Sequence, residues 1–496
     1  MAIELFNTLG SRVEPLLPAK DNTLRMYCCG PTVYDYGHIG NFRTFVHMDA
    51  LRRTARLQGF GLKHVMNITD VDDKIIRNAA AASMPISTYT EKFERAFFED
   101  MDALRVERPE IIARATENIG EMVTLIQQLA EQDIAYRAED GSWYFRIARF
   151  PAYGKLSGKD LEGIEDGARV DIDEYEKDTA RDFALWKAAK PGEASWDTPL
   201  GTGRPGWHIE CSAMATKHLG PDFDLHGGGE DLAFPHHENE IAQSECATHH
   251  TFARHWFHVR FLLVEGRKMS KSEGNFYTLR DLLLRGYRAS SIRFLLLSVP
   301  YRHQMNFTFD GLTESANAIE RLRTFARRME TASRDQQLPE AASDELDRLV
   351  ANKTESYRAA LRNDLNTAEA RAAMFDAVRA VNIALDNNSF GRGNLSAIRT
   401  LLDDFDAVFD VLVDRDAEVS RAAMQWAEAE GRSMDATPGM LASLSITDEQ
   451  VEALLLERTE ARRRRNFARG DAIRNELAEK GVLIEDGKNG ATWKRK

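Results

Sequence analysis

Apolar and polar positions alternate or recur at helical intervals along the N-terminal part of the chain. Residues 23–29 alternate and end at Gly30-Pro31, which predicts a strand. A turn-rich segment follows, residues 45–57 have helical spacing, and residues 62–68 predict a second strand. This order is typical of one right-handed parallel unit of a Rossmann-like sheet.

The middle of the chain departs from this order and then returns to it. Helical spacing extends over residues 111–132, and residues 138–205 are irregular, with a short strand-like piece at 142–145. We interpret the irregular region as an insertion into the nucleotide fold. Strand-like runs near Phe223 and over residues 257–264 then resume the sheet.

The C-terminal third is mostly helical. Nearly every segment of residues 312–414 has helical spacing, as residues 316–332 and 346–361 illustrate. Residues 431–445 contain Gly, Ser, Pro and Met without a period and indicate a linker. The remaining pattern predicts helices over residues 448–468 and 471–480, and a hairpin with strands over 482–485 and 491–493 and a turn over 486–490.

The predicted fold class is α/β. It consists of a Rossmann-like nucleotide-binding catalytic domain with an inserted connective domain, followed by a helical bundle and a small mixed α/β C-terminal domain. The predicted boundaries are 1–110 and 206–310 for the catalytic domain, 111–205 for the insertion, 311–430 for the bundle, 431–447 for the linker and 448–496 for the C-terminal domain.

Composition places the chain among ordinary globular proteins. A chain of 496 residues is too long to fold around a single hydrophobic core. Its contents of 43% hydrophobic and 29% charged residues are typical of globular proteins. No apolar run is long enough to span a membrane, and the N-terminus lacks the features of a secretory signal. The four cysteines, at positions 28, 29, 211 and 246, fit a reducing compartment rather than a disulfide framework. We therefore expect a cytoplasmic protein without membrane contact.

A cationic loop is the most informative segment. Lys268 and Lys271 stand three positions apart among serines and glycines, an arrangement that suits a triphosphate that changes shape during reaction. On its own, such a turn is also typical of a solvated loop.

A second segment, residues 37–41, complements this loop. His38 falls just before or within the first turn of a predicted helix, where backbone amides favour anions. Gly37 and Gly40 allow a base or a ribose to approach the backbone closely. On the residues alone, His38 could equally be a helix cap.

The two segments together resemble the nucleotide-binding signatures of class I aminoacyl-tRNA synthetases. The family pattern is His-Ile-Gly-His, so Asn41 departs from it at the fourth position, although asparagine can still donate a hydrogen bond. The resemblance implies that ATP, with magnesium, is a substrate and that Lys271 contacts it. It also assigns His38, Asn41 and Lys268 to the catalytic site, where catalysis is mostly positioning and charge stabilisation.

Thiol, imidazole and carboxylate side chains indicate a metal site. A credible four-ligand zinc set consists of Cys29, Cys211, His236 and Glu240. Residues 236 and 240 share a face if their segment is helical. On the residues alone, His237 could replace His236, and buried cysteines commonly behave as small hydrophobic residues instead.

Four longer segments resemble cysteinyl-tRNA synthetases, namely residues 27–35, 67–75, 203–211 and 226–232. The similarity runs over essentially the whole chain. It implies zinc at the positions of the four-ligand set, whereas Cys28 points to the opposite face of its strand. It also implies that Thr69 and Trp207 line the amino-acid pocket, although a strand-end threonine and a core tryptophan are alternatives on the residues alone.

Zinc has a physical purpose in such a site. Cysteine and serine differ by one atom, and rejecting serine requires a discrimination of about 10⁴, or roughly 5.5 kcal/mol. Because zinc prefers a thiolate to a neutral hydroxyl, we hypothesise that the metal reads the substrate and is not a hydrolytic catalyst. The nearby Asp70, Asp72 and Asp73 are interpreted as a solvated acidic turn rather than as a magnesium site.

Positive charge concentrates near the C-terminus. The net charge of −13 disfavours binding to nucleic acid, but such binding depends on where the charges lie and not on their sum. Residues 462–465 are four consecutive arginines, which we place on a helix. The resemblance implies that the C-terminal domain binds the anticodon, with Arg462, Asp471 and Asp486 suited to reading base edges. A solvated helix with salt bridges is the alternative on the residues alone.

The resemblance as a whole implies a monomeric enzyme that activates L-cysteine with ATP and transfers it from cysteinyl-adenylate to the 3′-terminal adenosine of tRNA(Cys). A related ligase that joins cysteine to an amino sugar is one alternative, but that family lacks the anticodon-binding end. A tRNA- or zinc-binding paralogue without catalysis is another, and His38, Lys268 and Lys271 argue against it.

Overall fold

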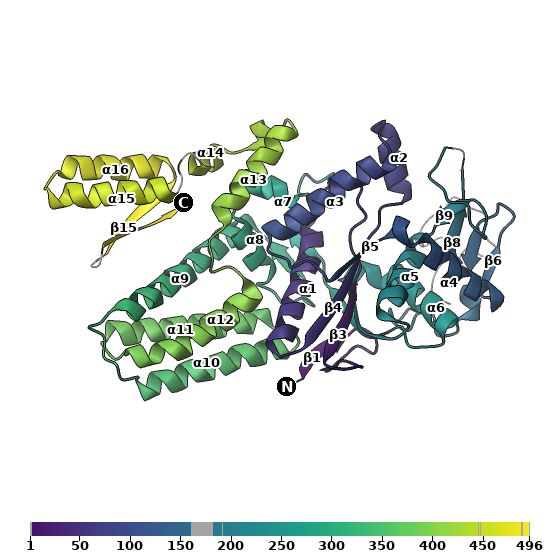
Figure 1. Cartoon of the computed structure of the whole chain (residues 1–496), viewed down its shortest axis with the longest axis horizontal. Coiled ribbons are helices and arrows are strands. Elements are labelled where there is room, and N and C mark those ends of the chain that lie inside the picture. The colour runs from purple at the N-terminus through teal and green to yellow at the C-terminus, as the bar shows by residue number, and fades with distance from the viewer. Residues whose placement is uncertain are drawn as a thin grey trace.

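A parallel sheet of five strands lies at the centre of the protein (Figure 1), in the order β11-β10-β3-β4-β5. Its strands are β3 (Thr23–Cys28), β4 (Gly61–Ile68), β5 (Ile111–Arg114), β10 (Phe223–Gly229) and β11 (Ala253–Val259). Helix α1 (Ile39–Leu57) connects β3 to β4, so the predicted strand–helix–strand unit is confirmed.

The computed structural model describes residues 2–159, 182–190, 192–444, 446, 448–487 and 490–495. Residues 445 and 447 of the predicted linker, and Lys488 and Asn489 of the predicted hairpin turn, lie outside the described residues. Within the described ranges, no helix combines the length and the apolar character that crossing a bilayer demands.

Helices cover both faces of the central sheet. One core joins the sheet to α1, and a second core joins its other face to α4 (Ile119–Glu131), α5 (Trp207–Leu219) and α6 (Glu238–Thr248). Cys28 belongs to the first core and Cys29 to the second. The two side chains therefore point to opposite faces, as the alternation of a strand requires.

Three predictions of secondary structure in and around the central sheet were wrong. Residues 111–114 form β5 and not the start of a helix, because Ile111 pairs with Val65 of β4, and α4 begins only at Ile119. Helix α1 begins six residues earlier than residue 45. The predicted strand over residues 257–264 is broken after Val259. A short apolar run does not distinguish strand from helix by its period alone, so pairing decides.

Smaller sheets flank the central one. The inserted region forms an antiparallel sheet of β6 (Ala135–Arg137), β7 (Trp143–Phe145), β8 (Phe183–Ala188) and β9 (Gly203–Pro205). The others are the hairpin of β1 (Ile3–Asn7) and β2 (Arg12–Leu16), and the sheet of β13 (Arg267–Lys268), β12 (Leu262–Val264) and β14 (Met305–Phe307). The helices between them are α2 (Asp73–Ala81), α3 (Ile86–Ala103), α7 (Leu279–Leu284) and α8 (Ala289–Leu296).

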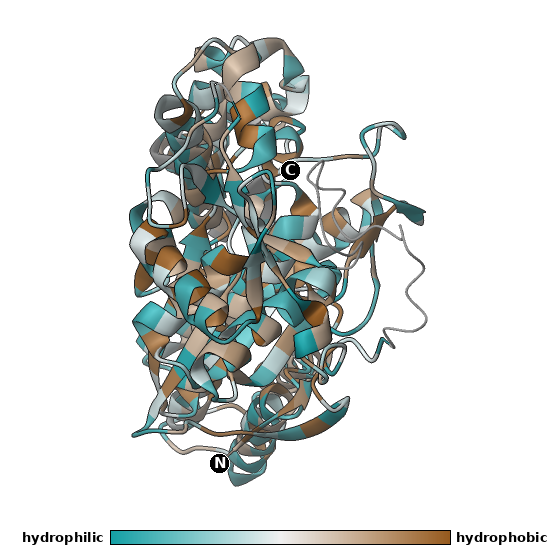
Figure 2. Ribbon diagram, turned by 90° about the vertical axis from the view of Figure 1, so that its right-hand side faces the viewer, coloured by the Kyte–Doolittle hydropathy of each residue, from teal (hydrophilic) through white to brown (hydrophobic). Residues whose placement is uncertain are grey.

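Helices dominate the rest of the chain. They are α9 (Phe309–Arg334), α10 (Asp344–Arg362), α11 (Thr367–Asp386), α12 (Leu395–Phe409) and α13 (Asp416–Ala429). Apolar and polar segments alternate along the helices in Figure 2, as expected for helices with one buried and one exposed face. The predicted linker contains a short helix, α14 (Pro438–Leu444).

The C-terminal domain contains α15 (Asp448–Arg463), α16 (Phe467–Glu479), β15 (Val482–Gly487) and β16 (Gly490–Arg495). It lies beside the helical bundle, at the opposite end of the molecule from the inserted sheet (Figure 1). The prediction that residues 462–465 all lie on a helix was wrong. Arg464 and Arg465 form the turn between α15 and α16, and Arg465 has a positive φ of 61°.

A buried ion pair joins α8 to α1. Arg293 Nη2 lies 2.6 Å from Asp49 Oδ2, and both side chains are buried. The same guanidinium donates to the Phe409 carbonyl at 2.6 Å and to the Leu104 carbonyl at 3.0 Å. One side chain therefore links α1, α3, α8 and the end of α12.

Arg293→Met should destabilise the protein. The change takes one of two arginines from the buried Asp49 and leaves four backbone carbonyls without this donor, which should cost about 3 kcal/mol or more. The thermal unfolding midpoint measures the loss. Arg399→Met, at an exposed position of α12, is the matched control, and equal midpoints for the two variants would contradict the prediction.

Candidate active site

His38 lies immediately before α1 and caps it. Its Nδ1 accepts a hydrogen bond from the Asn41 backbone N–H at 3.2 Å, and the Asn41 side-chain Oδ1 accepts from the His38 backbone N–H at 3.1 Å. This reciprocal arrangement is a capping box. Asparagine therefore has a definite task at position 41, because its side chain fixes the backbone of the histidine.

The cap also decides which ring nitrogen of His38 carries the proton. Burial, and then the nearby Lys271 ammonium, lower the pKa of His38 to about 4, so the ring is neutral at neutral pH. Because Nδ1 accepts the backbone hydrogen bond, the proton resides on Nε2. His38 can thus cap the helix and still donate from Nε2.

Two glycines permit this tight packing. A Cβ at Gly40 would lie 2.9 Å from the His38 ring and 3.3 Å from Met269 Cε, and a Cβ at Gly37 would lie 3.0 Å from the Phe42 ring. Any larger residue at either position would displace His38 or its neighbours. The packing of the protein itself therefore explains both glycines, without reference to a ligand.

The fold brings Lys271 close to His38. Lys271 Nζ lies 2.8 Å from Asp35 Oδ2 and 5.0 Å from the centroid of the Phe276 ring, which in turn meets the His38 ring edge to face at 5.1 Å. Sequence reasoning missed Asp35 as the partner of this lysine. Lys268 lies on β13, and its side chain is exposed.

Hydrogen bonds shape the lysine loop and tie it to α1. Asn275 accepts from the Ser270 N–H at 2.8 Å and donates through Nδ2 to the Lys268 carbonyl at 3.0 Å. The Ile39 N–H donates to the Tyr277 carbonyl at 3.1 Å. The two motifs found in the sequence are therefore adjacent parts of one site.

The four predicted zinc ligands also come together, and all are buried. Cys29 directly follows β3, Cys211 lies in α5, His236 lies in the turn before α6, and Glu240 lies in the first turn of α6. Cys29 Sγ lies 3.8 Å from Cys211 Sγ and 3.6 Å from Glu240 Oε1, and His236 Nε2 lies 3.0 Å from the same Oε1. Tetrahedral zinc, with bonds of about 2.0–2.3 Å, places its ligand atoms roughly 3.3–3.8 Å apart. The two distances from Cys29 fall in this range, whereas the 3.0 Å from His236 to Glu240 is that of an ion pair. The four donor groups thus converge closely enough to suit zinc.

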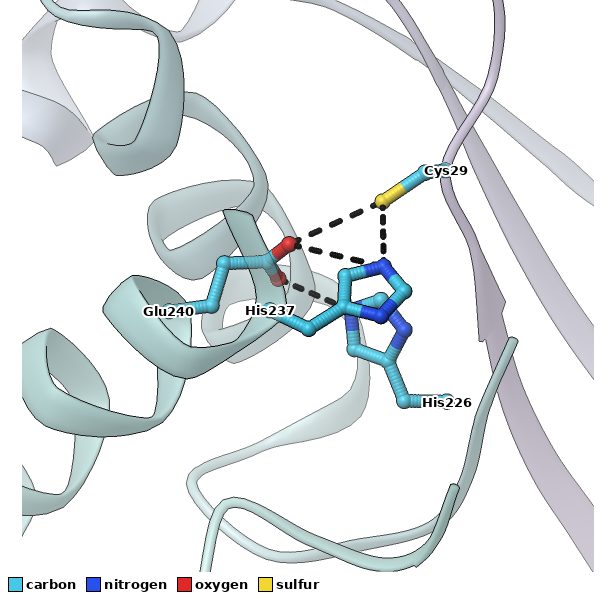
Figure 3. Close-up of side chains that lie close together, drawn as sticks. All are labelled: Cys29, His226, His237 and Glu240. Carbon is cyan, nitrogen blue, oxygen red and sulfur yellow. Dashed lines mark hydrogen bonds and ion pairs between the residues drawn. The ribbon is translucent and has the colours of Figure 1, made fainter. Parts of the chain in front are cut away.

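A second set of side chains shares two of these residues. Figure 3 shows His226 and His237 converging with Cys29 and Glu240. His237 Nε2 lies 3.3 Å from Cys29 Sγ and 4.0 Å from Glu240 Oε1, and His226 Nε2 lies 2.8 Å from Glu240 Oε2. Sequence reasoning considered His237 as an alternative ligand and missed His226.

Further histidines hold these rings in place. His208 Nδ1 lies 2.9 Å from His236 Nδ1, and His258 Nε2 lies 2.8 Å from His237 Nδ1. Hydrogen bonds of this kind orient the imidazole of a metal ligand. His208 and His258 were also missed, because their partners are distant in sequence and meet them only in the folded chain.

The cluster gathers buried charge of both signs: burial opposes protonation of His236, but Glu240 and Cys211 raise its pKa to about 10. Burial opposes ionisation of Glu240, but His226 and His236 lower its pKa to about 2. Burial also opposes ionisation of Cys211, but hydrogen bonds from Cys29 and His236 lower its pKa to about 6. Burial, and then Cys211, raise the pKa of Cys29 well above its usual value. A bound divalent cation would allow both thiols to ionise, so the donor chemistry also fits zinc.

The two predicted pocket residues lie beside this cluster. The Trp207 ring stacks on the His236 ring with centroids 4.2 Å apart. Thr69 Oγ1 donates to Glu210 Oε2 at 2.8 Å and lies 3.2 Å from Asn67 Nδ2. Burial, and then Cys211, raise the pKa of Glu210 well above its usual value. Glu210 is a buried acid next to a predicted ligand, and sequence reasoning did not single it out.

The acidic run after β4 has protein partners. Asp70 accepts from the Thr116 N–H at 3.0 Å, Asp72 caps α2, and Asp73 lies 3.0 Å from Lys187. Among the described residues, none of the three belongs to a cluster that could hold a metal. Each aspartate is thus engaged within the protein, and Asp70 is buried rather than solvated.

Arginines surround Asp486 in the C-terminal domain. Arg458 binds its carboxylate with both Nη atoms, at 2.7 and 2.8 Å, and Arg462 Nη1 lies at 3.1 Å. Hydrogen bonding to Arg458 lowers the pKa of Asp486 to about 2. Asp471 is exposed on α16, and it raises the pKa of Arg458 less than Asp486 does. The three predicted base-reading residues therefore lie near one another, around an arginine that was not predicted as part of the site.

Known structures share this architecture. Methionyl-tRNA synthetase of Mycobacterium tuberculosis, in complex with methionyl-adenylate, superimposes with a TM-score of 0.58 over 86% of this chain and 96% of that one, at 14% identity. At this identity the likeness shows the shared fold alone.

Sequence comparison identifies the class of protein and then the family. Residues 15–317 match the catalytic domain of class I (C) tRNA synthetases, residues 356–413 match the DALR domain, and residues 447–493 match the cysteinyl-tRNA ligase anticodon-binding domain. The cysteine–tRNA ligases of Koribacter versatilis and Solibacter usitatus are 57% and 52% identical, each with 100% of both chains covered. The chain belongs to the cysteine–tRNA ligase family.

The altered pKa of His38 can be tested by NMR. Lys271→Met should raise the pKa of His38 from about 4 towards its ordinary value, but only in part, because burial remains the larger cause. A pH titration of histidine-labelled protein measures the change, and His38→Gln assigns the signal. Lys268→Met removes a neighbouring exposed lysine and should leave the pKa of His38 unchanged. Equal pKa shifts in the two variants would contradict the specific effect of Lys271 on His38.

Proposed function

We propose that this enzyme activates L-cysteine with ATP and transfers the cysteinyl group to tRNA(Cys). The observation that carries the proposal is the adjacency of three features: the capped His38, the Lys271 loop, and a buried cysteine-lined cluster at the carboxyl edge of one parallel sheet. In the first step the cysteine carboxylate attacks the α-phosphorus of ATP and displaces pyrophosphate. In the second step a ribose hydroxyl of the terminal adenosine attacks the carbonyl carbon and displaces AMP.

The chain supplies positioning and charge for these steps. His38 donates its Nε2–H to a phosphate oxygen, and Asn41 holds the histidine in the orientation that makes this possible. Lys271 exchanges Asp35 for the triphosphate, which carries more negative charge and is bound with magnesium. Lys268 adds a second positive charge to the loop, and Gly37 and Gly40 allow the close packing around His38.

The amino-acid side of the site is buried. We assign one zinc ion to Cys29, Cys211, His236 and Glu240, because their donor atoms have the spacing and the charge that zinc requires. Bound there, zinc favours the thiolate of cysteine over the hydroxyl of serine. Trp207 keeps the His236 ring in place, and Thr69, with Glu210, forms the adjoining polar wall.

The C-terminal domain reads the anticodon in this proposal. Arg462, Asp471 and Asp486 are exposed and lie near one another, as base-reading side chains must. The proposed domain division follows the predicted one, except that the catalytic part extends to residue 114 to include β5. All four cysteines are free, which supports a reducing cytoplasm, and we propose that the enzyme acts as a monomer.

Cys211→Ser tests the metal and the activation step together. We expect purified wild-type protein to hold one zinc per chain and to exchange pyrophosphate with cysteine but not with serine. Cys211→Ser should lose most of the zinc and of the exchange, because it removes a thiolate ligand. Cys246→Ser changes a buried cysteine outside the cluster and should keep both properties. Exchange that survives the loss of zinc would contradict the role given to the metal.

Asp486→Asn tests the role of the C-terminal domain. Charging of tRNA(Cys) should fall by about tenfold or more, because one misread base typically costs 1–3 kcal/mol in recognition. Cysteine-dependent pyrophosphate exchange should not change, since that step requires no tRNA. Glu479→Gln, at the end of α16, serves as the control for a lost negative charge. Equal losses in tRNA charging and in pyrophosphate exchange would contradict the assignment of Asp486 to anticodon recognition.

A further inference from the structure

An aromatic cluster connects α13 to the loop that carries His38. Trp426 of α13 donates through Nε1 to the Tyr36 hydroxyl at 3.3 Å, and the two rings meet edge to face with centroids 5.4 Å apart. Tyr36 stands two positions before His38 and directly after Asp35, the ion-pair partner of Lys271. A side chain of α13 therefore contacts the loop between Asp35, the partner of Lys271, and His38.

Two arginines also contact the rings of this cluster. The Arg280 guanidinium lies 5.2 Å from the Tyr36 ring centroid and 4.8 Å from that of Trp426, and Asp100 holds it at 2.8 Å. Arg432 lies 5.2 Å from the Trp426 ring. Because a guanidinium attracts an aromatic face, these contacts restrain both rings.

The same region contacts the segment that follows the lysine loop. Arg432 Nη2 lies 2.8 Å from Asp281 Oδ1, and Asp281 forms a capping box with Thr278 at the start of α7. Thr278 is in turn paired through the backbone with His38. Both halves of the ATP site are thus connected to residues at and just beyond the end of α13.

Packing alone does not account for Trp426. Ala423 and Ala427 of the same helix are buried in the core that joins the central sheet to α1, and Trp426 packs against that core. Trp426 is only partly buried, and it directs its one N–H towards Tyr36. A purely apolar side chain would fill the space but would leave the tyrosine hydroxyl without this donor.

We propose that Trp426 is a positioning residue for ATP. It holds Tyr36 and so keeps residues 35–38 in the conformation that receives the triphosphate. The inference rests on the proposed function, because it takes ATP as the ligand of His38 and Lys271. One hydrogen bond and one ring contact couple Trp426 to the loop, so its loss should weaken ATP binding about five- to tenfold.

Trp426→Leu tests the inference in a pyrophosphate exchange assay with the full chain. The KM for ATP should rise about five- to tenfold, while the KM for cysteine stays at the wild-type value. Trp426→Phe keeps a ring but loses the N–H, so it should give a smaller rise. Gln425→Ala, at the exposed neighbouring position of α13, is the matched control and should behave as wild type.

Comparing the KM for ATP with the KM for cysteine distinguishes a positioning role of Trp426 from a general loss of structure. A fall in kcat with both KM values unchanged, or an equal rise in both, would overturn the inference. Wild-type protein without cysteine-dependent exchange would reject the proposed function itself, whereas exchange with an unaltered KM for ATP in Trp426→Leu would reject only the role of Trp426.

A double-mutant cycle decides the matter if Trp426→Leu does not fold. Tyr36→Phe and Trp426→Phe should each raise the KM for ATP, and the double variant should show no more than the larger single effect, because both remove the same hydrogen bond. Single effects that multiply in the double variant would contradict the inference.

Discussion

A carboxylate sealed inside the protein is the constraint on which the site depends. The side chain of Glu240 is fully buried, and its two oxygens lie 2.8 Å from His226 and 3.0 Å from His236. An unpaired buried carboxylate is very costly, so these partners must be in place for the fold to form as it does. They come from β10 and from the turn before α6, and they draw both segments against the end of β3, where Cys29 lies.

The site has two parts that differ in burial and therefore in the strength of their electrostatic interactions. The side chains of the cysteine-lined part are buried, so electrostatic interactions there are strong and can distinguish ligands that differ by one atom. The part that we propose to bind ATP is more open, and its Lys271 pairs with Asp35 while 67% of the lysine side chain is exposed. An exposed pair of this kind is weak and exchangeable, as the proposed binding and release of a polyanion require. The parallel sheet places both parts at the same edge.

The sequence could predict features that local patterns or short motifs carry. The β3–α1–β4 unit followed from periodicity, and the grouping of Cys29 with Cys211 followed from family resemblance. Strand β5 could not be predicted, because its four residues become a strand only by pairing with β4. Asp35 and Glu210 were missed for a similar reason, since each matters only through a neighbour distant in sequence.

The central claim is that the metal reads the thiol of cysteine. X-ray absorption at the zinc edge, with purified holoenzyme, tests it most directly because it counts the sulfur atoms bound to the metal. Cys29 and Cys211 should supply two sulfur ligands at about 2.3 Å in the free enzyme. Saturating cysteine should add a third sulfur, and serine at the same concentration should add none. A count that stays at two with cysteine present would contradict the account.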